Sequence, residues 1–219
     1  MARNDAASRP ARKAARLAEK LARRRRKVAE LAADIAGLEA ALAALEGGAA
    51  TAGPISPFAP AAFPALPELA GLRFASTAAG VRYGGRDDVM LAELAAGSAI
   101  AGSFTRSLTR SAPVLWCQER LAALAGGPAP GPLAIVVNSG NANAFTGRHG
   151  RAAVEAVAGQ TAAALGIPAG HVLVASTGVI GEPLPAERIT AKLGALAAGL
   201  APDRIEAAAR AIMTTDTFP

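Results

Sequence analysis

Cysteine is nearly absent from this sequence. Cys117 is the single cysteine, so the chain cannot form an internal disulfide, and a zinc cluster built from several thiolates is excluded. This usage is typical of proteins that work in a reducing compartment. Cys117 keeps helical spacing with Val114, Leu121 and Leu124, which predicts a buried core thiol rather than a nucleophile.

Histidine and clustered carboxylates are also scarce. His149 and His171 are the only histidines, and neither has a partner nearby in the sequence that would indicate a Ser-His-Asp triad. We expect both to be structural or surface residues. The one dense acidic pair, Asp87-Asp88, lacks further ligands beside it, so we expect no bound metal.

Long apolar runs are missing as well. No stretch of about eighteen uninterrupted apolar residues appears, and the N-terminus is charged instead of carrying the apolar core of a signal peptide. We therefore expect a cytoplasmic protein with no membrane partner. The glycines of 84–85 and 178–181 match neither a P-loop nor a dinucleotide fingerprint, so no nucleotide cofactor is expected.

Basic charge is present, but it is concentrated at one end. The net charge is +6, and the first fifty residues hold eleven Lys or Arg against six Asp or Glu. Residues 51–219 are close to neutral, with twelve basic and eleven acidic residues. This balance argues against a nucleic-acid surface spread over the main body.

The first 46 residues read as one basic helical extension. Its apolar residues alternate steps of three and four if Arg24 fills one position, which predicts a coiled coil of about four heptads: Leu17, Leu21, Val28, Leu31, Ile35, Leu38, Leu42 and Leu45. The Arg23–Lys27 run is either a solvated charged face or a contact for acidic lipid or nucleic acid. A Gly- and Pro-rich linker follows over 47–67, and the remaining domain covers 68–219.

The domain alternates strand and helix patterns, which indicates an α/β fold. Strands are expected at Leu72–Ala75, Val81–Tyr83, Val89–Leu94, Ile100–Thr105, Leu133–Val137 and His171–Ala175. Helices are expected from Pro113 to Leu124, around Val154–Leu165, at Pro185–Leu200 and at Pro202–Met213.

Two polar turns follow buried strands. One is Asn138–Gly147, with three Asn, one Ser and glycines; the other is Ser176-Thr177-Gly178, at the end of an apolar run that begins at His171. A Gly-containing turn at an element boundary offers free backbone N–H groups to a substrate. From local sequence alone the second turn is either an oxyanion site or an ordinary strand-to-helix turn, and the first is either part of a site or a turn stabilised by its own side chains.

Five longer motifs carry a resemblance to a known family. They are GVRYGGRDDVML, FTRSLTRSAPVLWC, VVNSGNANAFTG, STGVIGEPLP and IMTTDTFP, in this order between Ser56 and Pro219. They resemble the N-terminal half of bacterial ornithine acetyltransferases, the bifunctional glutamate N-acetyltransferases of arginine biosynthesis. The resemblance implies an α/β fold with stacked sheets between helices. It also implies a precursor that cleaves itself before a threonine, giving an α chain and a β chain whose N-terminal threonine is the nucleophile.

The same resemblance assigns roles to individual residues. It implies that Thr177 and Gly178 form the oxyanion hole, that Thr214 binds substrate, and that Asn138–Thr146 supports the site. Because an acyl-enzyme forms through a tetrahedral oxyanion, fixed donors aimed at it can contribute about 3 to 4 kcal/mol each. The free α-amine of the threonine, with a reference pKa near 8, is the expected base, which makes a histidine unnecessary.

The implied reaction moves acetyl from N2-acetylornithine to glutamate, with acetyl-CoA as an additional possible donor and no resident cofactor. The implied partner is a β chain, in a heterotetramer of two α and two β chains. Since the expected nucleophile lies beyond Pro219, this α-chain portion is expected to be inactive alone. The alternatives are a related self-processing aminopeptidase and a non-enzymatic oligomerisation module that assembles through residues 17–45. The extension has no counterpart in the family pattern, which usually begins near the SPFAP segment.

Overall fold

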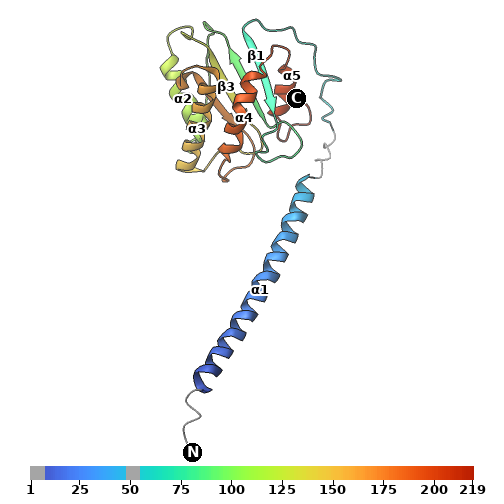
Figure 1. Ribbon diagram of the computed structural model, residues 1–219. Coiled ribbons are helices and arrows are strands. Elements are labelled where there is room, and N and C mark those ends of the chain that lie inside the picture. The colour runs from blue at the N-terminus through green and yellow to red at the C-terminus, as the bar shows by residue number, and fades with distance from the viewer. Residues whose placement is uncertain (1–7, 48–54) are drawn as a thin grey trace, which may run out of the picture. The chain divides into compact units, whose positions relative to one another are not determined.

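The chain divides into two units, Met1–Ala50 and Thr51–Pro219, and we describe each by itself. The computed structural model describes residues 8–47 and 55–219. In the first unit, α1 (Ser8–Gly47) is one continuous helix (Figure 1). Within the described residues, none of the helices combines the length and apolar character that a membrane span requires.

The second unit is an α/β domain with one four-stranded sheet in its described part. Its strands are β1 (Leu72–Thr77), β2 (Val89–Leu94), β3 (Leu133–Asn138) and β4 (Val172–Ser176). Its helices are α2 (Ala112–Leu124), α3 (Gly147–Leu165), the short η1 (Ala169–His171), α4 (Ala186–Ala198) and α5 (Ile205–Ala211). The α/β class is confirmed; of the stacked sheets implied by the resemblance, the described residues contain this one.

The sheet order is β1-β2-β3-β4, with an antiparallel half and a parallel half. β2 runs antiparallel to both β1 and β3, whereas β3 and β4 are parallel and α3 forms their crossover. In parallel strands the carboxyl ends lie at the same edge of a sheet. The last β3–β4 pair is Asn138 with Ser176, so the two polar turns predicted from the sequence begin side by side.

One face of the sheet and three helices form the main core. The buried strand residues on this face are neighbours across the sheet, because side chains alternate between faces: Ala75, Leu91, Val136 and Val174 share one row. They pack with buried side chains of α3 and α4, among them Val154, Val157, Ile189 and Leu193. Figure 1 shows α2, α3 and α4 as a layer against the sheet, with α5 on the other side of β1 from α4.

Two predicted strands are wrong. Val81–Tyr83 lies in a loop, because the backbone N–H groups of Ala79 and Val81 donate to the two carboxylate oxygens of Asp88, at 2.7 and 2.6 Å. The Asp88 side chain is fully buried, and this carboxylate takes the place of a neighbouring strand. Ile100–Thr105 is likewise irregular: no described strand pairs with it, so its apolar residues alone do not form a strand.

Cys117 lies on α2 and packs against the main core, as its helical spacing predicts, but it is half-buried rather than fully buried. Its Sγ lies 3.2 Å from the Val174 carbonyl oxygen. Burial raises the pKa of the Cys117 thiol above its ordinary value.

A raised thiol pKa has a measurable consequence. At pH 8 we expect Cys117 to react with a thiol reagent at least about tenfold more slowly in the folded chain than in the chain unfolded by urea. The sign also fixes a pH trend: because the unfolded thiol ionises at lower pH than the folded one, this group lowers stability as pH rises above about 8.5. Equal reaction rates with and without urea would contradict the partial burial of this thiol.

Candidate functional site

The two polar turns are joined by a ladder of backbone hydrogen bonds. The Thr177 N–H donates to the Asn138 carbonyl at 3.0 Å. Beyond it, the N–H of Val179 donates to Gly140 O at 3.2 Å, and Val179 O accepts from the N–H of Ala142 at 2.8 Å. The turn after β4 is therefore held against the turn after β3 along most of its length, and its backbone is fixed in position.

Gly178 lies at a close approach between the two turns. Its φ is +130°, a conformation that side-chain-bearing residues rarely adopt. A Cβ at this position would lie within 2.6 Å of both Asn141 N and Gly140 O, and closer still to Gly140 C. These are backbone atoms, and Gly140 O already accepts a hydrogen bond from the Val179 N–H, so the peptide unit cannot move aside without breaking that bond. The site therefore requires glycine at position 178.

Two donors of this turn have no partner within the described part of the chain. The Thr177 N–H is used by Asn138, but neither the Thr177 Oγ1 hydroxyl nor the Gly178 N–H makes a hydrogen bond to a described residue. Both residues are partly exposed. A hydroxyl and a backbone N–H on adjacent residues, fixed and reachable from solvent, can bind a carbonyl oxygen or an oxyanion.

The amide side chains of the β3 turn are hydrogen-bonded to residues of this turn and of the segments beside it. Asn138 Nδ2 donates to Asn141 O at 2.9 Å, and Asn141 Oδ1 accepts from the Asn143 N–H at 2.7 Å. Asn143, which has a φ of +46°, binds Thr146 Oγ1 through its Oδ1 and Gly150 O through its Nδ2. The three Asn side chains are buried. These contacts hold the turn in its shape, so its buried amide groups are not free to bind a ligand.

Thr214 reaches the same region through Tyr83. Its Oγ1 lies 2.9 Å from the Tyr83 hydroxyl, and its N–H donates to Asp216 Oδ2 at 3.1 Å. The Tyr83 ring borders Gly140, where a Cβ would lie 3.1 Å from Tyr83 Cε2. The three sequence-predicted residues thus belong to one connected region, with Tyr83 and Gly140 between Thr214 and Gly178.

Arg86 ties the C-terminal segment to the β3 turn. Its guanidinium lies 4.4 Å from the centre of the Tyr83 ring, and its Nη2 donates to Ser139 Oγ at 3.1 Å and to the Met213 carbonyl. Ser139, fully buried, donates in turn to Ala211 O at 2.8 Å. Sequence reasoning missed Tyr83 and Arg86 as individual residues, although both lie in the GVRYGGRDDVML motif.

The two histidines lie outside this arrangement. His149 is exposed in the first turn of α3, and His171 Nδ1 lies 3.0 Å from Pro132 O. Neither makes a hydrogen bond to Thr177, Gly178 or Thr214. Within the described ranges, no three His, Cys, Asp or Glu side chains come together as metal ligands would.

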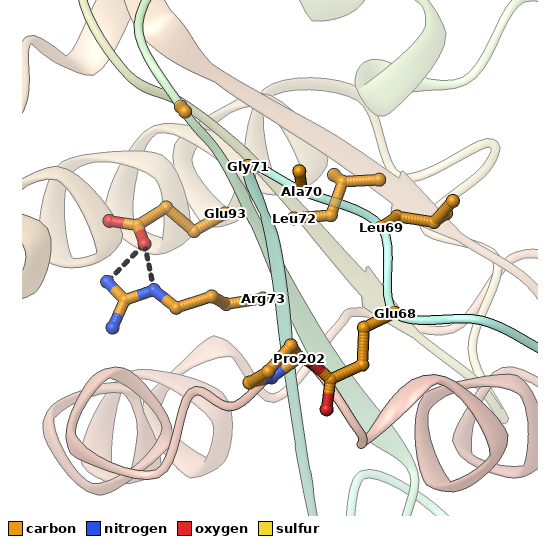
Figure 2. Close-up of a pocket in the computed structure, with 9 residues that line it drawn as sticks. Glu68, Leu69, Ala70, Gly71, Leu72, Arg73, Glu93 and Pro202 are labelled. Atoms are coloured by element: carbon orange, nitrogen blue, oxygen red, sulfur yellow. Dashed lines mark hydrogen bonds and ion pairs between the residues drawn. The ribbon is translucent and has the colours of Figure 1, made fainter.

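A separate hollow lies beside β1 (Figure 2). It is lined by residues 68–73 with Glu93, Ala95 and Pro202. Arg73 Nε donates to Glu93 Oε2 at 2.7 Å, so the guanidinium is already neutralised by a carboxylate. None of the three sequence-predicted site residues lines this hollow, and we do not assign the site to it.

Known proteins resemble the chain over this domain. Residues 73–219 match the ArgJ family. The arginine biosynthesis bifunctional protein ArgJ of Ruegeria pomeroyi is 61% identical over 164 residues, which cover 75% of this chain and 39% of the relative. That of Nitrobacter winogradskyi is 58% identical over 165 residues, with the same coverage. The chain therefore spans about two-fifths of the length of these curated relatives.

Solved structures show the same fold. An ornithine acetyltransferase of Mycobacterium tuberculosis, crystallised with ornithine, matches with a TM-score of 0.61 and 38% identity, over 68% of this chain and 79% of that one. The ArgJ protein of Bacillus halodurans matches with a TM-score of 0.57 and 33% identity, over 68% and 74%. The sequence-based resemblance is confirmed: this chain belongs to the ArgJ family.

Proposed function

We propose that this chain provides the oxyanion-stabilising half of an acetyltransferase that moves the acetyl group of N2-acetylornithine to glutamate in arginine biosynthesis. The observation that carries the proposal is the pair of free, fixed donors, Thr177 Oγ1 and the Gly178 N–H, in a chain of the ArgJ family. The ornithine in the solved acetyltransferase supports the choice of substrate. In this proposal the nucleophile is the N-terminal threonine of a β chain, and two α and two β chains assemble.

The proposed reaction has two acyl-transfer steps. The threonine hydroxyl attacks the acetyl carbon, and its α-amine takes the proton. The carbonyl oxygen becomes an oxyanion, which accepts hydrogen bonds from Thr177 Oγ1 and the Gly178 N–H. The C–N bond then breaks, the proton passes to the leaving amine, and ornithine departs. The amine of glutamate attacks the acetyl ester, and N-acetylglutamate leaves with the threonine hydroxyl restored.

Product analysis tests this function. The chain is co-expressed with a β chain that begins at the threonine, and N2-acetylornithine is supplied with and without glutamate. We expect ornithine and N-acetylglutamate in equal amounts, and little ornithine release without glutamate. Release of free acetate at the same rate without glutamate would indicate hydrolysis, as in a self-processing aminopeptidase, and would contradict transfer. A parallel reaction with acetyl-CoA tests that donor.

Tyr83 gives a more local prediction. In the assembled enzyme we expect Tyr83→Phe to raise KM for N2-acetylornithine about fivefold, with kcat nearly unchanged. The reason is that Thr214, the proposed substrate-binding residue, loses the one neutral hydrogen bond that orients its hydroxyl, worth about 1 kcal/mol. Thr214→Val removes the Thr214 hydroxyl itself and is expected to raise KM at least as much. A change in kcat with constant KM would place Tyr83 elsewhere in the mechanism.

A further inference from the structure

The helix α1 carries an apolar stripe along the part of its length whose side chains are described. Its large apolar side chains are exposed, among them Leu17, Leu21, Val28, Leu31 and Ile35. The ArgJ family match begins only at residue 73, so the acetyltransferase fold does not account for this helix. A row of exposed large apolar residues along a 40-residue helix marks an interaction surface.

The spacing of the stripe is that of a two-helix seam. In heptad notation the a positions are Leu21, Val28 and Ile35, and the d positions are Leu17, Arg24 and Leu31. The sequence continues the pattern with leucines at 38, 42 and 45. A stripe confined to a and d is narrow, and it fits a facing helix of the same kind.

The charges of α1 separate along its length. Residues 8–27 contain ten Lys or Arg and one Glu, whereas residues 28–47 contain four Asp or Glu and no Lys or Arg. Two copies aligned in parallel would bring basic half against basic half. Two antiparallel copies would place the basic half of each against the acidic half of the other, which is favourable for both.

The position of Arg24 also favours an antiparallel over a parallel pair of helices. It is exposed and occupies a d position in the seam. In a parallel pair in register, Arg24 would face its own copy, so two like charges would meet in the least solvated part of the interface. An antiparallel pair separates the two guanidinium groups and places each opposite an apolar residue of the partner helix, along which its stem can pack.

We propose that α1 pairs with α1 of a second copy of this chain as an antiparallel coiled coil. The pair is centred between Ala29 and Glu30, so that Arg24 faces Ile35 of the other copy and Val28 faces Leu31. This register overlaps nearly the whole helix. It also brings Lys27 and Asp34, both at g positions, together across the interface twice. Shifting the register by one heptad either way instead pairs Lys27 with Lys27 or Asp34 with Asp34.

The Arg23–Lys27 run does not indicate that α1 binds a membrane or nucleic acid instead of a second helix. Five consecutive residues of an α-helix, at 3.6 residues per turn, point in all directions around the axis. A helix that lies on a lipid surface instead gathers its cations on one polar face. The run therefore adds charge to the basic half without forming a single basic face.

Disulfide trapping tests the orientation in the full chain. In a Cys117→Ser background, chains carrying Arg24→Cys and chains carrying Ile35→Cys, each with a different tag, are mixed and oxidised. We expect the cross-link between position 24 and position 35 to exceed both self-cross-links at least tenfold. Dominant 24–24 and 35–35 cross-links would show a parallel pair and overturn the proposal.

A charge swap tests the register. Sedimentation of the full chain should show a dimer whose dissociation constant rises about tenfold in Lys27→Glu and in Asp34→Lys, because each variant creates two like-charge contacts. The double variant Lys27→Glu with Asp34→Lys should regain most of the affinity. Circular dichroism of each variant reports whether the helix persists. Failure of the double variant to recover, or salt-sensitive binding to duplex DNA or phosphatidylserine vesicles without self-association, would overturn the proposal.

Discussion

Replacing Thr177 by Ala is expected to lower kcat of the assembled enzyme by about 100- to 1000-fold, with little change in KM. The hydroxyl is proposed to donate to the oxyanion, which exists only in the transition state and the tetrahedral intermediate, so its loss costs about 2.7–4 kcal/mol of barrier and little substrate affinity. The backbone N–H of Thr177 is already bonded to Asn138 O and cannot replace it. Ornithine release measured by steady-state kinetics gives both constants.

Thr177→Ser is the matched control for this prediction. Serine keeps the hydroxyl and loses only a methyl group, so kcat is expected to remain within about tenfold of the original. Equal kcat values for the Ala variant and the original chain would show that the Thr177 hydroxyl does not stabilise the oxyanion. A rise in KM alone would make it a ground-state binding residue.

Replacing Gly178 by Ala is expected to destabilise the domain by about 3–5 kcal/mol. The new Cβ would overlap the backbone of Gly140 and Asn141, and φ of +130° is strained for alanine. Relief requires the two turns to separate and break hydrogen bonds between them, because the overlapping atom Gly140 O accepts the Val179 N–H. Urea unfolding followed by circular dichroism measures the loss as a lower midpoint.

Gly159→Ala is the control, because it is expected to raise the free energy of unfolding instead of lowering it. Gly159 lies inside α3, and a Cβ there would meet no atom within 4 Å. Alanine in a helix interior is expected to stabilise by about 0.5–1 kcal/mol. If Gly178→Ala unfolded at the same urea concentration as the original chain, the close approach of the two turns would be refuted.

The sheet and the helices were largely predictable because their signals are local. β2 is found at its predicted bounds, β1 and β3 extend two residues and one residue further than predicted, and β4 is shifted by one residue at both ends. The last helix is shorter than predicted, Ile205–Ala211 instead of Pro202–Met213. The two wrong strands depended on what lies beside them: Val81 donates to a buried carboxylate, and a preference for strand structure cannot reveal that partner.

The sequence identifies the candidate site residues but does not show how they lie relative to one another. Both turns carry a local signature of Gly, Asn or hydroxyl residues, and the family motifs point to Thr177, Gly178 and Thr214. Their mutual placement depends on contacts between distant segments, such as Tyr83 with Thr214 and Arg86 with Ser139. No period or spacing in the sequence records such contacts. The sequence likewise cannot show which donors of the second turn are free. In the structure the Thr177 N–H donates to Asn138 O, whereas Thr177 Oγ1 and the Gly178 N–H have no described partner.

The most direct test of the oxyanion assignment is the structure of the assembled enzyme with its threonine trapped as a tetrahedral adduct, for example by an acetyl-mimicking phosphonate. If Thr177 and Gly178 form the oxyanion hole, one oxygen of the adduct lies 2.7–3.1 Å from both Thr177 Oγ1 and the Gly178 nitrogen. An adduct whose oxygens face solvent or other donors, with both of these atoms unbonded, would contradict this assignment.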